Sequence, residues 1–294
     1  MSPDALLPSL ARAATFGCII FIAGTAAWYW LILARTGPQS PLTLKATARR
    51  GTISALLLIP ALIAGFIAQV LSFREPAEPV GDVVRLVLSI PWGRVWLLQL
   101  ILALLLTVFF AMAKTRAVAW VPVAFAAIAL AFTPAFAGHA AAVEEWGRLA
   151  RMADGLHVLA AGVWLGSLAN LALAVRQEPD GGILLARLAR FSPLALVSAA
   201  VIAATGVTSA WIHLTRLSDL WGSPYGRLLS VKVLVFLGVL AAGAYNWRRA
   251  TPRLRESADP RAMRKTIAAE LAFAAVLILV TAWFVATSPP ESMS

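Results

Sequence analysis

Residues that commonly carry chemistry are scarce in this sequence of 294 residues. It contains one cysteine, three histidines and five methionines, and charged residues make up only 13% of it. A single cysteine excludes an intrachain disulfide and a Cys-x-x-Cys motif. The sequence also lacks a glycine-rich phosphate loop, a serine-nucleophile elbow and an acidic cluster within its apolar segments. We therefore expect a protein that is not an enzyme and does not hydrolyse ATP by itself.

Apolar residues are the abundant class, at 60% of the sequence, which indicates that the surrounding solvent is lipid. A spanning helix needs roughly 20 mostly apolar residues. Eight segments meet this length, at residues 9–34, 51–73, 93–113, 117–138, 153–175, 191–214, 226–247 and 267–287. We predict an all-α polytopic membrane protein, with residues 1–294 forming a single membrane domain. The apolar run after Arg12 is too long for a signal peptide, so we expect it to be the first span.

The formal net charge of +11 is sorted by side of the membrane. One set of loops holds most of the 25 basic residues, namely Arg35, Lys45, Arg49, Arg50, Lys114, Arg116, Arg176, Arg187, Arg190, Arg248, Arg249, Arg253, Arg255, Arg261, Arg264 and Lys265. The opposite side holds most acids, namely Asp4, Glu75, Glu78, Asp82, Glu144, Glu145, Asp154, Asp219 and Glu291. The basic side is expected to be cytoplasmic, with both termini outside. This pattern explains the charge through the lipid bilayer, with no nucleic acid as partner, and favours a bacterial inner membrane.

Two stretches four spans apart echo each other. Pro91-Trp92-Gly93-Arg94 opens the third span and Pro224-Tyr225-Gly226-Arg227 opens the seventh, with Gln99 and Lys232 at the same offset. A weaker match pairs Arg12 and Cys18 with Arg151 and His157. A parallel repeat of two four-helix halves, residues 1–138 and 139–294, would produce this pattern, although chance matches arise easily in apolar sequence. We interpret Trp92-Gly93-Arg94 and Tyr225-Gly226-Arg227 as structural or gating motifs that cap the outer ends of their spans.

The three histidines, His139, His157 and His213, each lie at the predicted outer end of a different span. His157 lies about one turn inside its span, where an ionisable residue without a role is unusual, and Trp164 shares its helix face. Neutral imidazole binds copper, zinc or haem iron, but a histidine at an interface can also serve as a polar tip. His157 and His213 are the leading candidate ligands, and His139 is next.

Two further residues can supply sulfur ligands. Cys18 lies about two turns into the first span, where a thiolate would suit Cu(I) and a thiol would suit packing as a small hydrophobe. Met152 precedes His157 by five residues and offers a soft thioether, or packing at a helix start. Both are secondary candidates for a metal site.

Two charged residues fall within the predicted spans. Glu270 can pair with Arg264 or Lys265 at the start of its helix, or take part in ion or proton movement. Lys232 can extend outward to the interface or pair with an external acid such as Asp219. The sequence leaves both pairs of alternatives open.

Taken together, the second half resembles the CopD (PcoD-like) family of copper-resistance and copper-import membrane proteins. The matching stretches are Gly138-His139-Ala140, Asp154-Gly155-Leu156-His157, Trp164-Leu165-Gly166, Arg190-Phe191-Ser192, Thr205-Gly206 and Ser223-Pro224-Tyr225-Gly226-Arg227 with Lys232. They define a CopD-like core at residues 138–254. The first half agrees through Trp92-Gly93-Arg94 and the pattern of spans.

This resemblance implies an inner-membrane protein that serves copper resistance by moving copper, as Cu(I) or Cu(II), from the periplasm toward the cytoplasm. It also implies a small periplasmic copper-binding partner of the CopC type, and it is compatible with a homo-oligomer. No Met-x-x-Met pair lies in a span, so a continuous path of soft ligands is not evident. Two other functions stay open: a redox protein with haem b held between His157 and His213, and an assembly factor in which the histidines are incidental.

Overall fold

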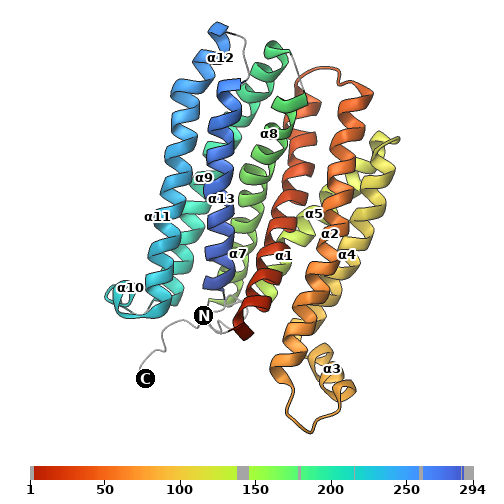
Figure 1. Ribbon diagram of the computed structural model, residues 1–294, viewed down its shortest axis with the longest axis vertical. Coiled ribbons are helices and arrows are strands. Elements are labelled where there is room, and N and C mark those ends of the chain that lie inside the picture. The colour runs from red at the N-terminus through yellow and green to blue at the C-terminus, as the bar shows by residue number, and fades with distance from the viewer. Residues whose placement is uncertain are drawn as a thin grey trace.

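The computed structural model of the protein describes residues 3–137, 146–177, 180–214, 216–257, 261–285 and 287, and every regular element among them is a helix (Figure 1). The first part of the chain forms α1 (Pro3–Ala27), η1 (Trp28–Ile32), η2 (Leu33–Arg35), α2 (Pro41–Phe73), α3 (Val80–Ser89), α4 (Pro91–Ala113), η3 (Ala117–Ala119), α5 (Trp120–Phe132) and η4 (Thr133–Phe136). The second part forms α7 (Gly147–Ala161), η5 (Gly162–Gly166), α8 (Ser167–Gln177), α9 (Gly181–His213), α10 (Asp219–Gly222), α11 (Pro224–Tyr245), η6 (Asn246–Ala250), α12 (Thr251–Ser257) and α13 (Arg261–Phe284).

Eight helical stretches within the described residues are long and apolar enough to cross a membrane, which confirms the predicted number of spans. They cover Leu6–Arg35, Pro41–Phe73, Pro91–Ala113, Ala117–Phe136, Gly147–Gln177, Gly181–His213, Pro224–Arg249 and Arg264–Phe284. The second and sixth begin about ten residues before the predicted positions 51 and 191. The reason is local: Ser40 accepts a hydrogen bond from the Thr43 N–H at 3.1 Å, and Asp180 from the Gly182 N–H at 2.7 Å. These N-caps extend each helix through polar residues that an apolar count omits.

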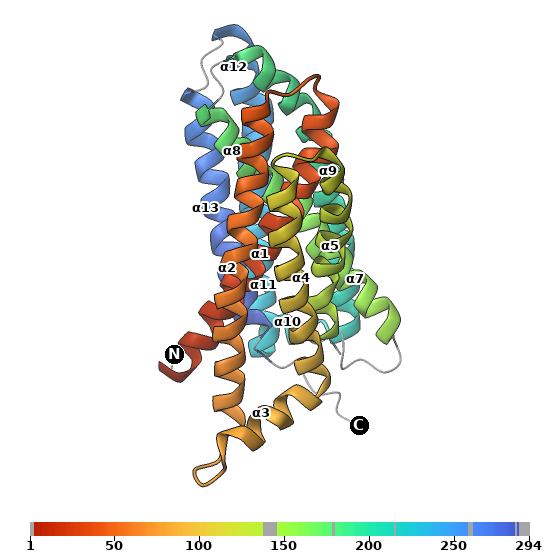
Figure 2. The same ribbon diagram turned by 90° about the vertical axis from the view of Figure 1, so that its right-hand side faces the viewer.

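The spans form one bundle whose two ends differ in composition. α1 begins and α13 ends at the same end, which also carries α3 and α10, whereas α12 and the connection from α1 to α2 lie at the opposite end (Figures 1 and 2). We call the first the terminal end and the second the basic end, because the loops rich in arginine and lysine lie there. The assignment of the basic end to the cytoplasm stays a prediction.

Helix α1 lies between two apolar cores and packs against both. Its residues Ile19 and Ile22 are fully buried in the core formed with α2, α4 and α5, and Trp28 follows them into the core of the second half. A Cβ atom at Gly24 would lie 2.3 Å from the Cα of Gly166, so the α1 backbone touches the π turn η5. Small residues permit this close approach of membrane helices. The contact fixes the position of η5, which carries Trp164.

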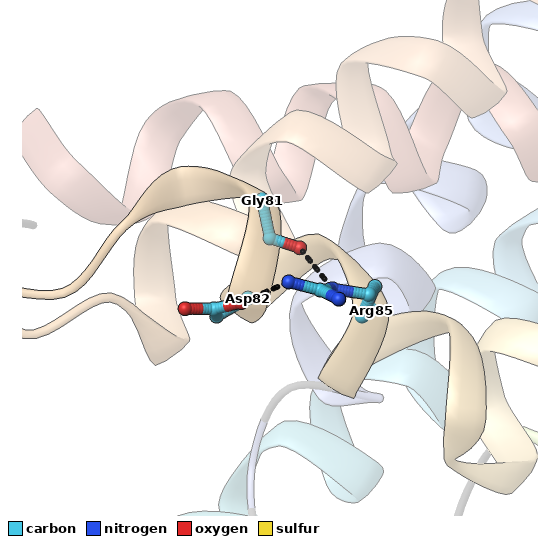
Figure 3. A network of polar contacts seen from close by, with 3 residues as sticks. All are labelled: Gly81, Asp82 and Arg85. Carbon is cyan, nitrogen blue, oxygen red and sulfur yellow. Dashed lines mark hydrogen bonds and ion pairs between the residues drawn. The ribbon is translucent and has the colours of Figure 1, made fainter.

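The short helix α3 closes the terminal end of the first half. Its residues Val83 and Val87 are fully buried against Val70 of α2, while its other face is exposed. On that exposed face Arg85 forms an ion pair with Asp82 and donates to the Gly81 carbonyl at 3.4 Å (Figure 3). An exposed pair of this kind adds little stability, so the buried valines hold α3 in place.

Candidate functional site

A cavity of about 700 Å³ lies in the second half of the bundle. α7 packs against α9 and α11 packs against α13, and the cavity lies between these two helix pairs. Phe16 and Ile20 of α1 and Pro134 of η4 complete its wall. Most lining residues are apolar, and the polar ones are Asp154, His157, Ser209, His213, Tyr225, Ser230, Lys232 and Thr281. A largely apolar cavity with a few convergent polar groups is the usual form of a binding site.

His157 projects from α7 and is oriented by α9. Its Nδ1 lies 2.9 Å from the Thr205 hydroxyl oxygen, and that hydroxyl lies 2.7 Å from the Val201 carbonyl. Because the hydroxyl donates its proton to the carbonyl, it accepts from the imidazole. The proton of the neutral ring is therefore on Nδ1, and the lone pair is on Nε2. Such a hydrogen bond is what orients histidine ligands in metal sites.

His213 ends α9, and its ring is also held by a backbone oxygen. Its Nδ1 donates to the Ser209 carbonyl, 2.8 Å away and one turn earlier. The ring stacks on Tyr225, with centroids 6.3 Å apart, and Tyr225 packs in turn on Phe284 at 4.6 Å. The two leading candidate ligands thus line one cavity with their rings held by neighbouring groups.

Asp154 and Lys232 bring opposite charges into the same cavity. Asp154 lies one turn before His157 and interacts electrostatically with Lys232, His213 and Tyr225. The Lys232 ammonium lies 5.2 Å from the centre of the Phe284 ring. The partner expected for Lys232, Asp219, instead accepts a hydrogen bond from the Arg216 backbone at 2.8 Å. Lys232 is two turns into α11, where it faces α7 rather than the loop.

The site residue that sequence reasoning missed is Asp154. We had counted it among the external acids, because it stands near the predicted start of its span. The available signal was its spacing: residues three apart share a helix face, so Asp154 had to lie on the side of His157. The carboxylate is therefore part of the cavity wall.

Of the other candidate ligands, Cys18 and Met152 do not line this cavity. Cys18 is packed against the core of the first half, whereas Phe16 and Ile20, two residues to either side, line the cavity; residues two apart lie on opposite faces of a helix. Met152 is 52% exposed and does not line it either. His139 lies outside the residues that the structure describes. Among the described residues, no three histidine, cysteine, aspartate or glutamate side chains are gathered to hold a metal ion. Ligand roles for Cys18, Met152 and His139 stay predictions.

The two motifs predicted to cap spans lie at similar tight turns, each between a short helix and the span that follows it. We call these turns the two corners, α3–α4 and α10–α11. Pro91 begins α4 directly after α3, and Pro224 begins α11 directly after α10. A Cβ atom at Gly93 would lie 2.0 Å from the Val87 carbonyl, and one at Gly226 would lie 1.9 Å from the Asp219 carbonyl. Glycine is therefore required at both positions, because the preceding helix touches the backbone. Arg94 and Arg227, which follow these glycines, are exposed.

Trp164 lies at the end of the cavity that is nearer the basic end of the bundle. It belongs to the π turn η5, is 4% exposed, and meets Phe236 of α11 edge to face at 6.1 Å. π turns within helices are frequent at functional sites. Trp164 and His157, which share a helix face in the sequence pattern, both line this cavity.

Comparison with known proteins identifies two family matches that together cover most of the chain. Residues 2–149 match the family described as Copper resistance protein D-like, N-terminal domain, and residues 185–284 match Copper resistance protein D. The chain is also 30% identical over 208 residues to the copper transport protein CutJ of Bacillus subtilis (strain 168), which covers 68% of the chain and 37% of CutJ. The chain thus spans little more than a third of this relative. No solved structure matches the chain.

Proposed function

The chain belongs to the copper resistance protein D family of multi-pass membrane proteins, and we propose that it carries copper ions across the membrane through the cavity of its second half. One observation carries this proposal: His157 and His213 line one cavity, and the Nδ1 atom of each ring is held by a neighbouring oxygen. The naming of CutJ as a copper transport protein supports copper as the cargo.

The donor set suits copper better than a hard cation. Imidazole nitrogen binds both Cu(I) and Cu(II), whereas Mg²⁺ and Ca²⁺ prefer oxygen. The Asp154 carboxylate supplies the negative charge that a desolvated copper ion needs. Lys232 supplies a positive charge that competes with the ion for that carboxylate. Copper would enter by drawing Asp154 away from Lys232, so Lys232 limits how long the ion stays.

The proposed direction is from the terminal end to the basic end, which corresponds to periplasm toward cytoplasm. Support comes from the position of His213 and Tyr225 at the terminal end, where a partner can deliver the ion. Asp219 and the acids around α3 lie at this end, so a periplasmic copper protein of the CopC type with a basic face would be attracted to it.

Topology is tested with reporter fusions. Fusions after Arg50, Lys114, Pro179 and Arg255 should report the cytoplasm, and a fusion near Glu145 should report the outside, because the basic loops stay inside. A reversal at any of these points would place the cavity mouth on the wrong side for copper uptake.

Copper binding is tested with the double variant His157→Ala, His213→Ala. Its affinity for copper, measured against a competing chelator in detergent, should fall by at least about 100-fold, because both nitrogen donors are lost. Cys18→Ala tests the sulfur ligand separately: Cys18 lies outside the cavity, so this variant should bind copper like the wild type, and a loss of affinity would add the thiol to the site. Wild-type affinity in the double variant would move the copper site elsewhere.

Haem b is the alternative that the cavity volume favours, because about 700 Å³ lies within the range of sites for sizeable organic ligands. Two histidines on adjacent helices can hold haem iron. An absorption spectrum of the purified protein decides between them. A strong haem band that disappears in the double variant would replace copper transport with a redox function, and a colourless protein that binds copper would exclude it.

A further inference from the structure

A buried carboxylate that the proposed copper site does not use lies on the side of Trp164 that faces the basic end, away from the cavity. Glu270 of α13 is 2% exposed. One of its oxygens, Oε2, accepts a hydrogen bond from the Asn246 amide at 2.7 Å, and the carboxylate also interacts with the side chain of Trp164. The other oxygen, Oε1, lies against Gly243, where a Cβ atom would be only 3.3 Å away. Trp164 therefore separates the cavity from Glu270 and touches both.

Among the described residues, the two side chains shown to hold this carboxylate, Asn246 and Trp164, are neutral. Arg264, one of the two partners that the sequence allows for Glu270, donates instead to the Val175 carbonyl at 3.0 Å, and Lys265, the other, is exposed. Within the described part of the chain, the one ion pair is between Arg85 and Asp82, far from Glu270 in the fold. A carboxylate held by neutral donors can gain or lose a proton without breaking an ion pair. Ionisable residues of this kind within membrane helices commonly mark ion pathways and proton relays.

Asn246 adds a second polar group that lacks its full set of partners. Its Oδ1 atom is buried and accepts no hydrogen bond from the described residues. It opens the π turn η6, as Trp164 lies in the π turn η5, so irregular helix turns bracket Glu270 on both sides. A protonated Glu270 carboxyl has an O–H to donate, and an unoccupied amide oxygen next to it can accept that bond. The same pair of side chains can thus satisfy both protonation states.

We propose that Glu270 is the proton-binding group of the transport cycle, and that it releases a proton toward the basic end when copper occupies the cavity. This rests on the proposed function. The positive charge of copper on the far side of Trp164 favours the ionised carboxylate, and ionisation transfers the carboxyl proton to water at the basic end. By reciprocity, a proton on Glu270 weakens copper binding to the same degree. Copper movement would then be linked to a proton gradient.

Other titratable groups surround this site and must be separated from it. The elements packed against α13 carry Asp4, Arg12, Cys18, Arg176, Tyr225, Arg227, Lys232, Tyr245, Arg248, Arg249, Arg253, Arg255 and Glu256, and α13 itself carries Arg261, Arg264 and Lys265. Across Trp164 lie Asp154, His157 and Lys232. Arginine keeps its charge over the neutral range, but any copper ligand that carries a proton also releases it when the metal binds. The test therefore compares variants of Glu270 rather than the pH dependence of the wild type alone.

The experiment measures protons released per copper ion bound by the purified full-length protein, with a pH indicator in weak buffer. Glu270→Gln should release about one proton fewer than the wild type, because the amide cannot ionise. Glu256→Gln, an exposed glutamate on α12, is the matched control and should release the wild-type number. Infrared difference spectra should show that copper removes a protonated-carboxyl band in the wild type and in the control, and that no such band changes in Glu270→Gln.

The outcomes separate the two proposals. If the wild type binds copper and Glu270→Gln releases the same number of protons, Glu270 is structural and this inference is wrong, while the copper site stands. If the wild type binds no copper, the proposed function fails first. Should Glu270→Gln not fold, Trp164→Phe keeps a ring but removes the indole N–H. It should shift the pH midpoint of copper-linked proton release, and an unchanged midpoint would overturn the inference.

Discussion

Two corners of the molecule, one between α3 and α4 and one between α10 and α11, are built alike. Their aromatic side chains pack against different surroundings. Each consists of a short helix, a proline that starts the next span, an aromatic residue, and a glycine touched by a backbone carbonyl. Trp92 of the first corner packs on Phe66 of α2 with centroids 6.4 Å apart, which completes an apolar wall. Tyr225 of the second corner, 3% exposed, stacks on His213 and lines the cavity.

The contrast continues two turns further along each helix. Gln99 of α4 is buried and donates a hydrogen bond to Thr133 at 2.9 Å, so the first half contains a closed, neutral contact. Lys232, at the same offset in α11, faces Asp154 across the cavity. Cys18 and His157 differ in the same way, since one packs in a core and the other lines the cavity. Similar corners therefore place a neutral contact in one half and charged residues at a cavity in the other, and the side chains make the difference.

The largest effect is expected when a buried positive charge is placed in the first half, at the position that corresponds to Lys232. Gln99→Lys should lower the free energy of unfolding by about 3 kcal/mol or more, because Thr133 cannot balance a buried ammonium. Thermal unfolding in one detergent measures this effect. Gln99→Leu, which removes the hydrogen bond without adding a charge, is the control and should cost only about 1 kcal/mol. Equal losses in both variants would mean that the first half tolerates charge and that the two halves differ less than their contents indicate.

The reverse exchange sharpens the comparison. Lys232→Gln gives the second half the residue type of the first and should raise copper affinity about tenfold, because the positive charge that competes for Asp154 is gone. Titration of copper against a chelator measures it, with Lys232→Arg as the control that keeps the charge. A loss of affinity would instead show that the ammonium holds Asp154 in the geometry that copper needs.

The smallest effect is expected at the exposed ends of the two corners. Arg227→Ala should change copper affinity of the purified protein by less than about twofold, because Arg227 is exposed and does not line the cavity. Copper accumulation in cells should nevertheless fall if the corner moves during transport, and Arg94→Ala in the first half should leave it unchanged. A large loss of affinity in Arg227→Ala would mean that the motif builds the site itself.

Much of the architecture could be predicted because lipid imposes simple rules on sequence. Every backbone polar group in the hydrocarbon region needs an internal partner, so long apolar segments become helices, and their number follows from length and hydropathy. The ends of the helices could not be placed the same way. Ser40 and Asp180 extend α2 and α9 by capping them, and capping depends on one side chain rather than on the average character of a segment.

The sequence by itself determined eight membrane spans and their charge asymmetry, and it predicted His157 and His213 as the leading candidate ligands. Only the tertiary structure decided that the two imidazoles share a cavity with Asp154 and Lys232, and that Cys18 faces away from it. It also decided that Glu270 meets Asn246 rather than Arg264. The physical reason is that helix periodicity assigns a residue to a face, whereas the partner of that face depends on how distant helices pack. Here the glycine contact between α1 and η5 sets that packing, and with it the position of Trp164 between the two polar clusters.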